Sequence, residues 1–188
     1  MENYASQAPK ASPETRAWQV AVLASPVQAK RENVNDAKII GGTQDDRKKL
    51  LELHEAYLVA NGKFDWPAIE PIWSKQPHAR FFNLNGHTYQ GAEHWSRLWA
   101  FYGKNVKGSY WTPYEIGGEI SGNMAVVWCH RRGSRNWIGS NSPPRDIHYQ
   151  GQEFMSRSTM VFHKEEGKWR IVHAHFSVGD VGDRPGGI

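Results

Sequence analysis

Apolar side chains recur at helical spacing in the first half of this chain and alternate with polar ones in much of the second half. The first helical run starts at Thr43, which can accept hydrogen bonds as an N-cap, and ends at Asn61-Gly62. Asp65, closely followed by a proline, predicts the start of a second and shorter helix. A third helix is predicted over residues 91–102, where aromatic and leucine side chains share one face.

Strand patterns lie between and after these helices. Residues 79–84 and 87–90 flank Asn85-Gly86, a pair that is typical of a tight hairpin turn. Residues 109–121 and 124–132 predict two longer antiparallel strands. The residues from 133 to 151 are rich in Gly, Ser, Pro, Asn and Arg, and we expect them to form a long loop, a type that often covers a functional site.

The C-terminal residues 153–177 predict a hairpin whose charged turn contains Gly167. Strict alternation along the second strand places two sets of side chains on opposite faces. One face is expected to carry Trp169, Ile171, His173, His175 and Ser177, and the other Arg170, Val172, Ala174 and Phe176.

The order of these patterns, with helices early and strands late, predicts one α+β domain over residues 43–180. Residues 1–42 show little periodicity and are expected to form a flexible arm, with the alternative that the arm wraps a neighbouring subunit. Residues 181–188 are expected to be a short tail. A length of 188 residues suits a single domain of ordinary size.

Composition narrows the possible functions. The net charge of +4 is mild and no basic run is dense, so we expect no nucleic-acid partner, whereas an anionic small molecule is easily accommodated. The single cysteine, Cys129, excludes an intrachain disulfide and favours a cytoplasmic location. No apolar run reaches the ~20 residues of a membrane helix, so no membrane partner is expected. Nine tryptophans suit an aromatic core, an aromatic-lined cavity or a subunit interface.

The order of elements, together with the run from Trp169 to Ser177 (Trp-Arg-Ile-Val-His-Ala-His-Phe-Ser), resembles the nuclear transport factor 2-like superfamily. Within it, the sequence is most similar to SnoaL-like domains and to the association (hub) domain of calcium/calmodulin-dependent protein kinase II, over residues 44–179. The resemblance implies a cone-shaped, curved antiparallel sheet that wraps around three helices and leaves an internal pocket. It does not specify a function, because such folds host many.

Comparison with ketosteroid isomerase, a relative by fold, implies which residues lie at the reacting positions. Tyr57 matches the position of the enzyme's tyrosine, but the base position falls near Asn83 and the acid position near Ser158. Neither an amide nor a hydroxyl replaces a carboxylate there, which argues against steroid-isomerase chemistry. The candidate catalytic residues are Tyr57, Asn83, His130 and Arg131, with His130 a possible general acid or base.

In hub domains the cavity carries arginines, and of the matching positions Arg131, Met160 and Phe176 only the first keeps the charge. The resemblance therefore implies a more apolar pocket. We also expect no cofactor. The residues expected to bind substrate are Phe81, Trp95, Val127, Ser158, Met160, Val172 and Phe176.

His173 and His175 form a His-x-His pair that could bind a metal if His130 or Glu153 approached as a third ligand. The resemblance places the pair on the outer face instead, which favours a hydrogen-bonding or interface role over a metal site. We therefore expect no metal.

These observations support two functions. The first is a SnoaL-like enzyme that performs general acid/base isomerisation, cyclisation or hydration of a small hydrophobic or aromatic metabolite. The alternative is a non-catalytic oligomerisation module that resembles the kinase hub. In either case the resemblance and symmetry favour a homo-oligomer, at least a dimer.

Overall fold

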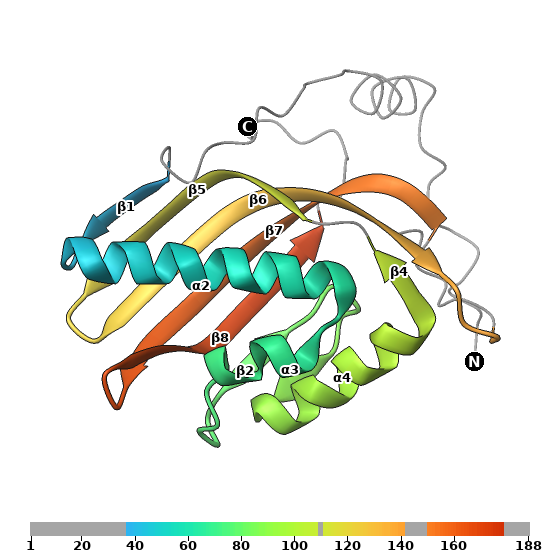
Figure 1. Cartoon of the computed structure of the whole chain (residues 1–188), viewed down its shortest axis with the longest axis horizontal. Coiled ribbons are helices and arrows are strands. Elements are labelled where there is room, and N and C mark those ends of the chain that lie inside the picture. The colour runs from blue at the N-terminus through green and yellow to red at the C-terminus, as the bar shows by residue number, and fades with distance from the viewer. Residues whose placement is uncertain (1–36, 109–110, 142–149, 179–188) are drawn as a thin grey trace, which may run out of the picture. The chain divides into compact units, whose positions relative to one another are not determined.

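The computed structural model of the chain describes residues 37–108, 111–141 and 150–178. Within these ranges the helical elements are α2 (Gln44–Lys63), α3 (Trp66–Ile69), the 3-10 helix η3 (Glu70–Ile72) and α4 (Gly91–Asn105). The strands are β1 (Lys38–Gly41), β2 (Arg80–Phe82), β3 (Thr88–Gln90), β4 (Val106–Gly108), β5 (Thr112–Ser121), β6 (Met124–Trp137), β7 (Gln150–Glu165) and β8 (Lys168–Val178). The α-helices lie on one face of a curved sheet, which confirms the predicted α+β fold (Figure 1).

The sheet is mixed rather than purely antiparallel. Its strands follow the order β1-β5-β6-β7-β8-β2-β3, and β4 pairs with β6. The pairs β1–β5 and β2–β8 are parallel, and the other pairs are antiparallel. Strands β2 and β8 are far apart in sequence, so no hairpin fixes their relative direction.

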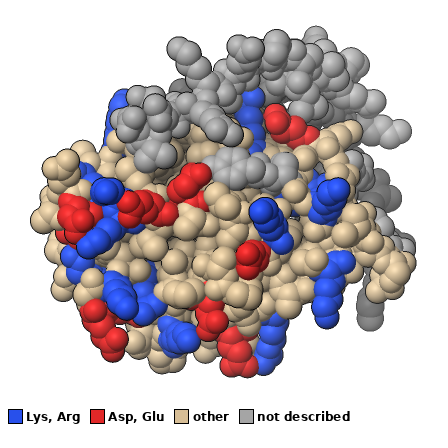
Figure 2. All heavy atoms as spheres, in the orientation of Figure 1, with Lys and Arg blue, Asp and Glu red and all other residues tan. Residues whose placement is uncertain are grey.

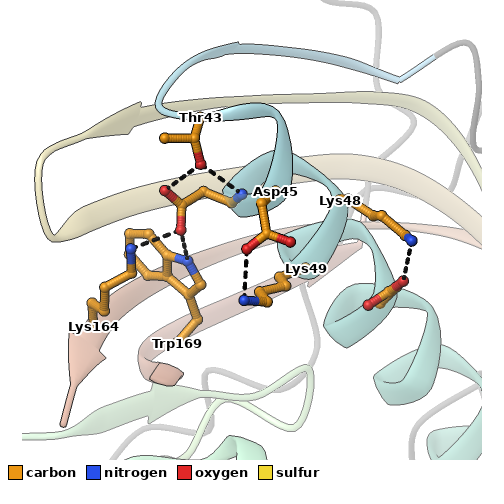
Figure 3. A network of polar contacts seen from close by, with 8 residues as sticks. Thr43, Asp45, Lys48, Lys49, Lys164 and Trp169 are labelled. Carbon is orange, nitrogen blue, oxygen red and sulfur yellow. Dashed lines mark hydrogen bonds and ion pairs between the residues drawn. The ribbon is translucent and has the colours of Figure 1, made fainter. Parts of the chain in front are cut away.

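Helix α2 begins and ends as its sequence predicts, within two residues. The Thr43 hydroxyl accepts a hydrogen bond from the backbone N–H of Asp46 at 3.1 Å. The Asp46 carboxylate in turn accepts hydrogen bonds from Lys164 at 2.7 Å and Trp169 at 2.9 Å, which ties the helix to the β7–β8 hairpin (Figure 3). Phe64 closes the helix in a left-handed conformation, just beyond the predicted end.

The predicted loop over residues 133–151 is wrong at both ends. Strand β6 continues to Trp137, and β7 already starts at Gln150. Only residues 142–149 lie outside the described part of this segment. The glycine, serine and arginine at positions 133–135 disfavour a strand by propensity, but pairing with β7 and β4 on both edges overrides that preference.

The predicted N-terminal arm also ends earlier than expected. Its residues Lys38–Gly41 form β1, which pairs with β5. Residues 1–36 and the tail from 179 to 188 lie outside the described residues.

Strand β8 changes the face of its buried side chains halfway along. Phe162 pairs with Ile171 and Val161 with His173, so Val172 has no opposite residue. Trp169 and Ile171 are buried before this bulge, and Val172, Ala174 and Phe176 are buried after it. The expectation that Trp169 and Ile171 share a face with His173 is therefore wrong, because strict alternation fails at a bulge.

The surface mixes charges of both signs. Figure 2 shows Lys and Arg side chains interspersed with Asp and Glu over the face in view. Several of them form exposed pairs one helical turn apart, such as Lys49 with Asp45 at 2.6 Å. None of the described helices is long and apolar enough to cross a membrane.

Candidate functional site

A small cavity lies between the helices and the inner face of the sheet. Its volume is about 40 Å³, room for a few water molecules, whereas pockets for whole metabolites measure ~300 Å³ or more. Aromatic side chains dominate its wall and fill most of the cone. The lining residues are Tyr57, Asn61, Phe64, Asn83, Leu84, Trp95, Leu98, Trp99, Tyr102, Trp111, Arg131, Arg135 and Phe154.

Arg131 is the most unusual residue of this wall because it is a fully buried cation. Its guanidinium lies between two rings, 4.3 Å from the centroid of Trp111 and 4.6 Å from that of Phe176. Its Nε donates to the Ser156 hydroxyl and its Nη1 to the Tyr57 hydroxyl, each at 3.2 Å. Cation–π contacts and two neutral hydrogen bonds offset part of the desolvation of the charge.

Tyr57 extends from α2 to the guanidinium of Arg131. Its ring stacks on Phe176 at 5.7 Å, and Phe176 also stacks with Trp95 at 6.0 Å. Burial raises the pKa of Tyr57, and nearby Arg131 opposes that effect, so the hydroxyl stays protonated at neutral pH. Because this oxygen accepts from Arg131, its own proton remains available for a ligand.

Arg135 is a second buried arginine of the wall, which sequence reasoning missed. It donates from Nη2 to the Asn61 side-chain oxygen at 2.8 Å, and its guanidinium lies 4.5 Å from the Trp111 ring. Residues 131, 133 and 135 are buried in alternation along β6. The same alternation could have been read from the sequence if the strand had not been ended at residue 132.

Asn83 lines the opposite side of the cavity, next to the end of β2. Its amide nitrogen lies 3.4 Å from the hydroxyl of Tyr102, which also receives a contact from Asn85. The structure thus brings Tyr57, Asn83, Trp95 and Arg131 to the wall of one cavity. None of the described lining residues is a carboxylate or a histidine.

The other residues expected to bind substrate face inward but belong to the core beside the cavity. Phe176 contacts the lining residues Tyr57, Trp95 and Arg131, and Phe81 packs against Trp95 at 5.4 Å. All are buried without lining the cavity: Phe81, Val127, Ser158, Met160, Val172 and Phe176.

Ser158 takes part in a separate buried polar cluster. Its hydroxyl lies 3.2 Å from the Cys129 sulfur, and His54 Nε2 lies 3.5 Å from the same sulfur. Burial raises the pKa of the Cys129 thiol and lowers the pKa of His54 to about 4, with the charge of Arg131 as a further cause for the histidine. A neutral thiol beside a neutral imidazole is not an activated nucleophile.

His130 does not belong with the other candidate catalytic residues. It follows the buried Cys129 and precedes the buried Arg131 on β6, so alternation turns it to the outer face of the sheet. There its Nδ1 pairs with the Glu115 carboxylate at 2.8 Å, next to the ring of Tyr114. His130, expected as a possible general acid or base, therefore does not line the cavity that Tyr57 and Arg131 share.

His173 and His175 also lie on the outer face, which is the placement that the resemblance favoured. His173 Nδ1 donates to the Arg80 carbonyl oxygen at 2.9 Å, and both imidazoles contact the ring of Phe82. In the part of the chain that the structure describes, no group of three His, Cys, Asp or Glu residues could hold a metal ion. A metal site at His173 and His175 would need a third ligand, and the described residues do not place one beside them.

Comparison with solved structures gives the same fold repeatedly. A nuclear transport factor 2-like superfamily protein from Salmonella enterica has a TM-score of 0.61 and 22% identity, covering 77% of this chain and 99% of that chain. A candidate dehydratase of the same fold family from Streptomyces avermitilis has a TM-score of 0.59 and 15% identity, covering 73% and 99%. The association domain of C. elegans calcium/calmodulin-dependent protein kinase II has a TM-score of 0.51 and 17% identity, covering 72% and 97%. At these identities the likeness concerns the fold alone.

No curated protein matches the sequence. The model of the SnoaL-like domain matches residues 50–180, the range that contains the cavity and nearly all of the sheet. Because this match spans well over half of the chain and the cone fold agrees with it, the protein belongs to the SnoaL-like domain family.

Proposed function

We propose that the protein binds a small hydrophobic or aromatic metabolite inside the cone and isomerises, cyclises or hydrates it. The observation that carries this proposal is the pair Arg131–Tyr57, which presents hydrogen-bond donors to an aromatic-lined cavity in a water-poor interior. Buried donors at a fixed position stabilise negative charge that develops on a substrate oxygen.

The proposed chemistry differs from that of a two-carboxylate isomerase. By the resemblance to ketosteroid isomerase the position of the base falls near Asn83, and an amide cannot take a proton at neutral pH. Asn83 would therefore orient the substrate by hydrogen bonding. Reactions whose barrier lies in forming an enolate-like oxygen anion suit Arg131 and Tyr57 best, with the proton carried by the substrate or by water.

Binding of a whole metabolite requires the cavity to enlarge from about 40 Å³. The lining rings would have to change rotamers or shift, as in other complexes in which side chains rearrange around a ligand. A ligand that enters in this way should increase thermal stability, because it binds only the folded state.

The first test is native mass spectrometry of the purified protein, repeated under denaturing conditions to release any bound small molecule. The identified compound, or a close analogue, is then titrated against wild type and Tyr57→Phe. Loss of the hydroxyl should lower affinity or turnover about tenfold. The matched control is Ser121→Ala, at an exposed position at the end of β5. Equal values for wild type and Tyr57→Phe would contradict the assignment of the site.

A second function, assembly into a homo-oligomer, is favoured by the outer face of the sheet. Phe82, Trp128 and Met155 are large apolar side chains exposed on this face. Trp128 lies opposite Thr159, which pairs in turn with His175, the neighbour of Phe82. A row with an exposed tryptophan at one end and an exposed phenylalanine at the other suits burial against a second copy of the chain.

A further inference from the structure

We infer that the ligand of this cavity is an anion, and that its carboxylate group binds the free edge of the Arg131 guanidinium. The inference rests on the proposed function and adds the chemical class of the ligand. It follows from the hydrogen bonds that Arg131 makes, from the charges around it and from the surplus of donors in the wall.

The surroundings of Arg131 leave one edge of its guanidinium open. The rings of Trp111 and Phe176 lie close to the guanidinium, and Ser156 accepts from Nε. Tyr57 accepts from Nη1, and Nη2 has no hydrogen-bond partner among the described residues. The N–H groups that remain belong to Nη1 and Nη2, the pair that binds both oxygens of a carboxylate side by side.

The charge of Arg131 is also uncompensated within the described residues. Its contacts there are two hydroxyl groups and aromatic rings, with no carboxylate in ion-pairing distance. Buried charges in proteins are normally paired, since an unpaired one is strongly destabilising. A bound anion would supply the missing partner.

The neighbouring polar groups are donors as well. The Trp95 indole N–H is buried without an acceptor, and the Tyr57 hydroxyl proton is not needed by Arg131. The Asn61 side-chain oxygen already accepts from both Trp111 and Arg135. A wall with several spare donors selects a ligand that only accepts, which a carboxylate does and a neutral amide or alcohol does not.

The size of the cavity fits this assignment. About 40 Å³ is room for a carboxylate group but not for the body of a metabolite. The charged group would occupy the space next to Arg131, and the hydrophobic remainder would take space that the lining rings now fill.

The test compares benzoate with benzamide, which has nearly the same shape and no charge, by calorimetric titration and thermal shift. Benzoate should bind wild type about tenfold or more tightly than benzamide. Arg131→Gln should abolish this preference, and Arg131→Lys should keep part of it, because the charge remains without the planar edge. The matched control is Arg132→Gln, the adjacent arginine on the other face of β6, whose guanidinium lies over Tyr114. It should keep the full preference.

Each alternative result has a distinct meaning. Equal binding of benzoate and benzamide, or an unchanged preference in folded Arg131→Gln, would overturn the anion assignment and leave a pocket for neutral metabolites. Failure of both compounds and of larger neutral aromatics to bind would overturn the proposed function as well. If Arg131→Gln does not fold, Arg131→Lys and the benzamide comparison still decide the question.

Discussion

Arg131 occupies a position where alternation along β6 would normally place an apolar side chain. Its neighbours on the buried face are Cys129 and Gly133, and both are small. The absence of a side chain at Gly133 is needed, because a Cβ there would lie 2.8 Å from the Trp111 ring. A small residue beside the arginine therefore gives space to the tryptophan that packs against the guanidinium.

Four residues that line the cavity were among those predicted from the sequence, and for two of them the reason is physical. Tyr57 and Trp95 lie on the apolar stripes of helices with clear periodicity, so their inward direction follows from 3.6 residues per turn. Arg131 and Asn83 came from the family resemblance. Alternation along β6 would have placed Arg135 on the same face, but its contacts with Asn61 and Trp111 could not be predicted, because these residues are far apart in sequence.

His54 provides a test of the buried polar cluster. Its pKa is about 4 in the fold against an ordinary value of 6.5, so between these pH values the unfolded chain binds a proton that the fold does not. Stability should therefore decrease as pH falls from 7 to 4, by roughly 3 kcal/mol from this group alone. Urea unfolding of wild type and His54→Leu across this range measures the difference.

The His54→Leu variant should lose that part of the pH dependence, whereas His175→Gln, at an exposed position, should retain it. Identical pH profiles for wild type and His54→Leu would show that the imidazole is protonated inside the fold.

The start of α2 shows how one element is fixed to another. Thr43 and Asp46 cap the helix, and the same Asp46 carboxylate holds Lys164 and Trp169 of the hairpin. The cap could be predicted from local sequence, but the link to the hairpin could not. Strands β1 and β4 were missed for a related reason: each is three or four residues long and is formed only through its pairing partner.

Asp46→Ala should destabilise the protein by roughly 1–3 kcal/mol, because it removes charge-assisted hydrogen bonds and exposes a helix terminus. The control is Asp45→Ala, whose carboxylate makes only an exposed pair with Lys49 and should change stability by less than about 1 kcal/mol (Figure 3). Equilibrium unfolding measures both changes, and equal effects would contradict the link.

The hydrogen bonds of Asp46 also predict how stability depends on pH in strong acid. The bonds from Lys164, Trp169 and Thr43 hold the pKa of Asp46 well below its ordinary value of 3.8. The ionised Asp46 carboxylate therefore contributes fully to the free energy of unfolding above pH 3.8, and this contribution is lost as the pH falls further. Asp46→Ala should be less sensitive than wild type to acid in this lower range, which lies below the range in which His54 acts.

In the described domain, the two faces of the sheet carry different kinds of side chain. The inner face holds the arginines, the tyrosine and the aromatic rings, and the outer face holds the histidines and exposed apolar side chains. The resemblance predicted this cone and its helices. It could not predict how full the cone is, because the space left depends on how all the aromatic side chains pack together.

The assembly proposal can be tested with a substitution on the outer face of the sheet. If the outer face packs against a second copy, Trp128→Glu should convert the oligomer into monomers, because assembly would bury an unpaired carboxylate. Light scattering after size-exclusion chromatography measures the mass. Val59→Glu, at an equally exposed apolar position on α2, should leave the mass unchanged. A monomeric wild type, or an unchanged mass for Trp128→Glu, would contradict assembly through this face.

The bulge at Val172 sets which side chains of the following half of β8 face inward. A change in the number of residues there would therefore be harder to accommodate among relatives than a substitution. Insertion of one residue between Val172 and His175 would turn Phe176 outward and place His175 in its position beside Tyr57. Substitutions along this half-strand can be accommodated one at a time, but an insertion or deletion would exchange its two faces at once. Length differences between related chains are therefore expected at the turn Glu166-Gly167, where an added residue changes no inward position.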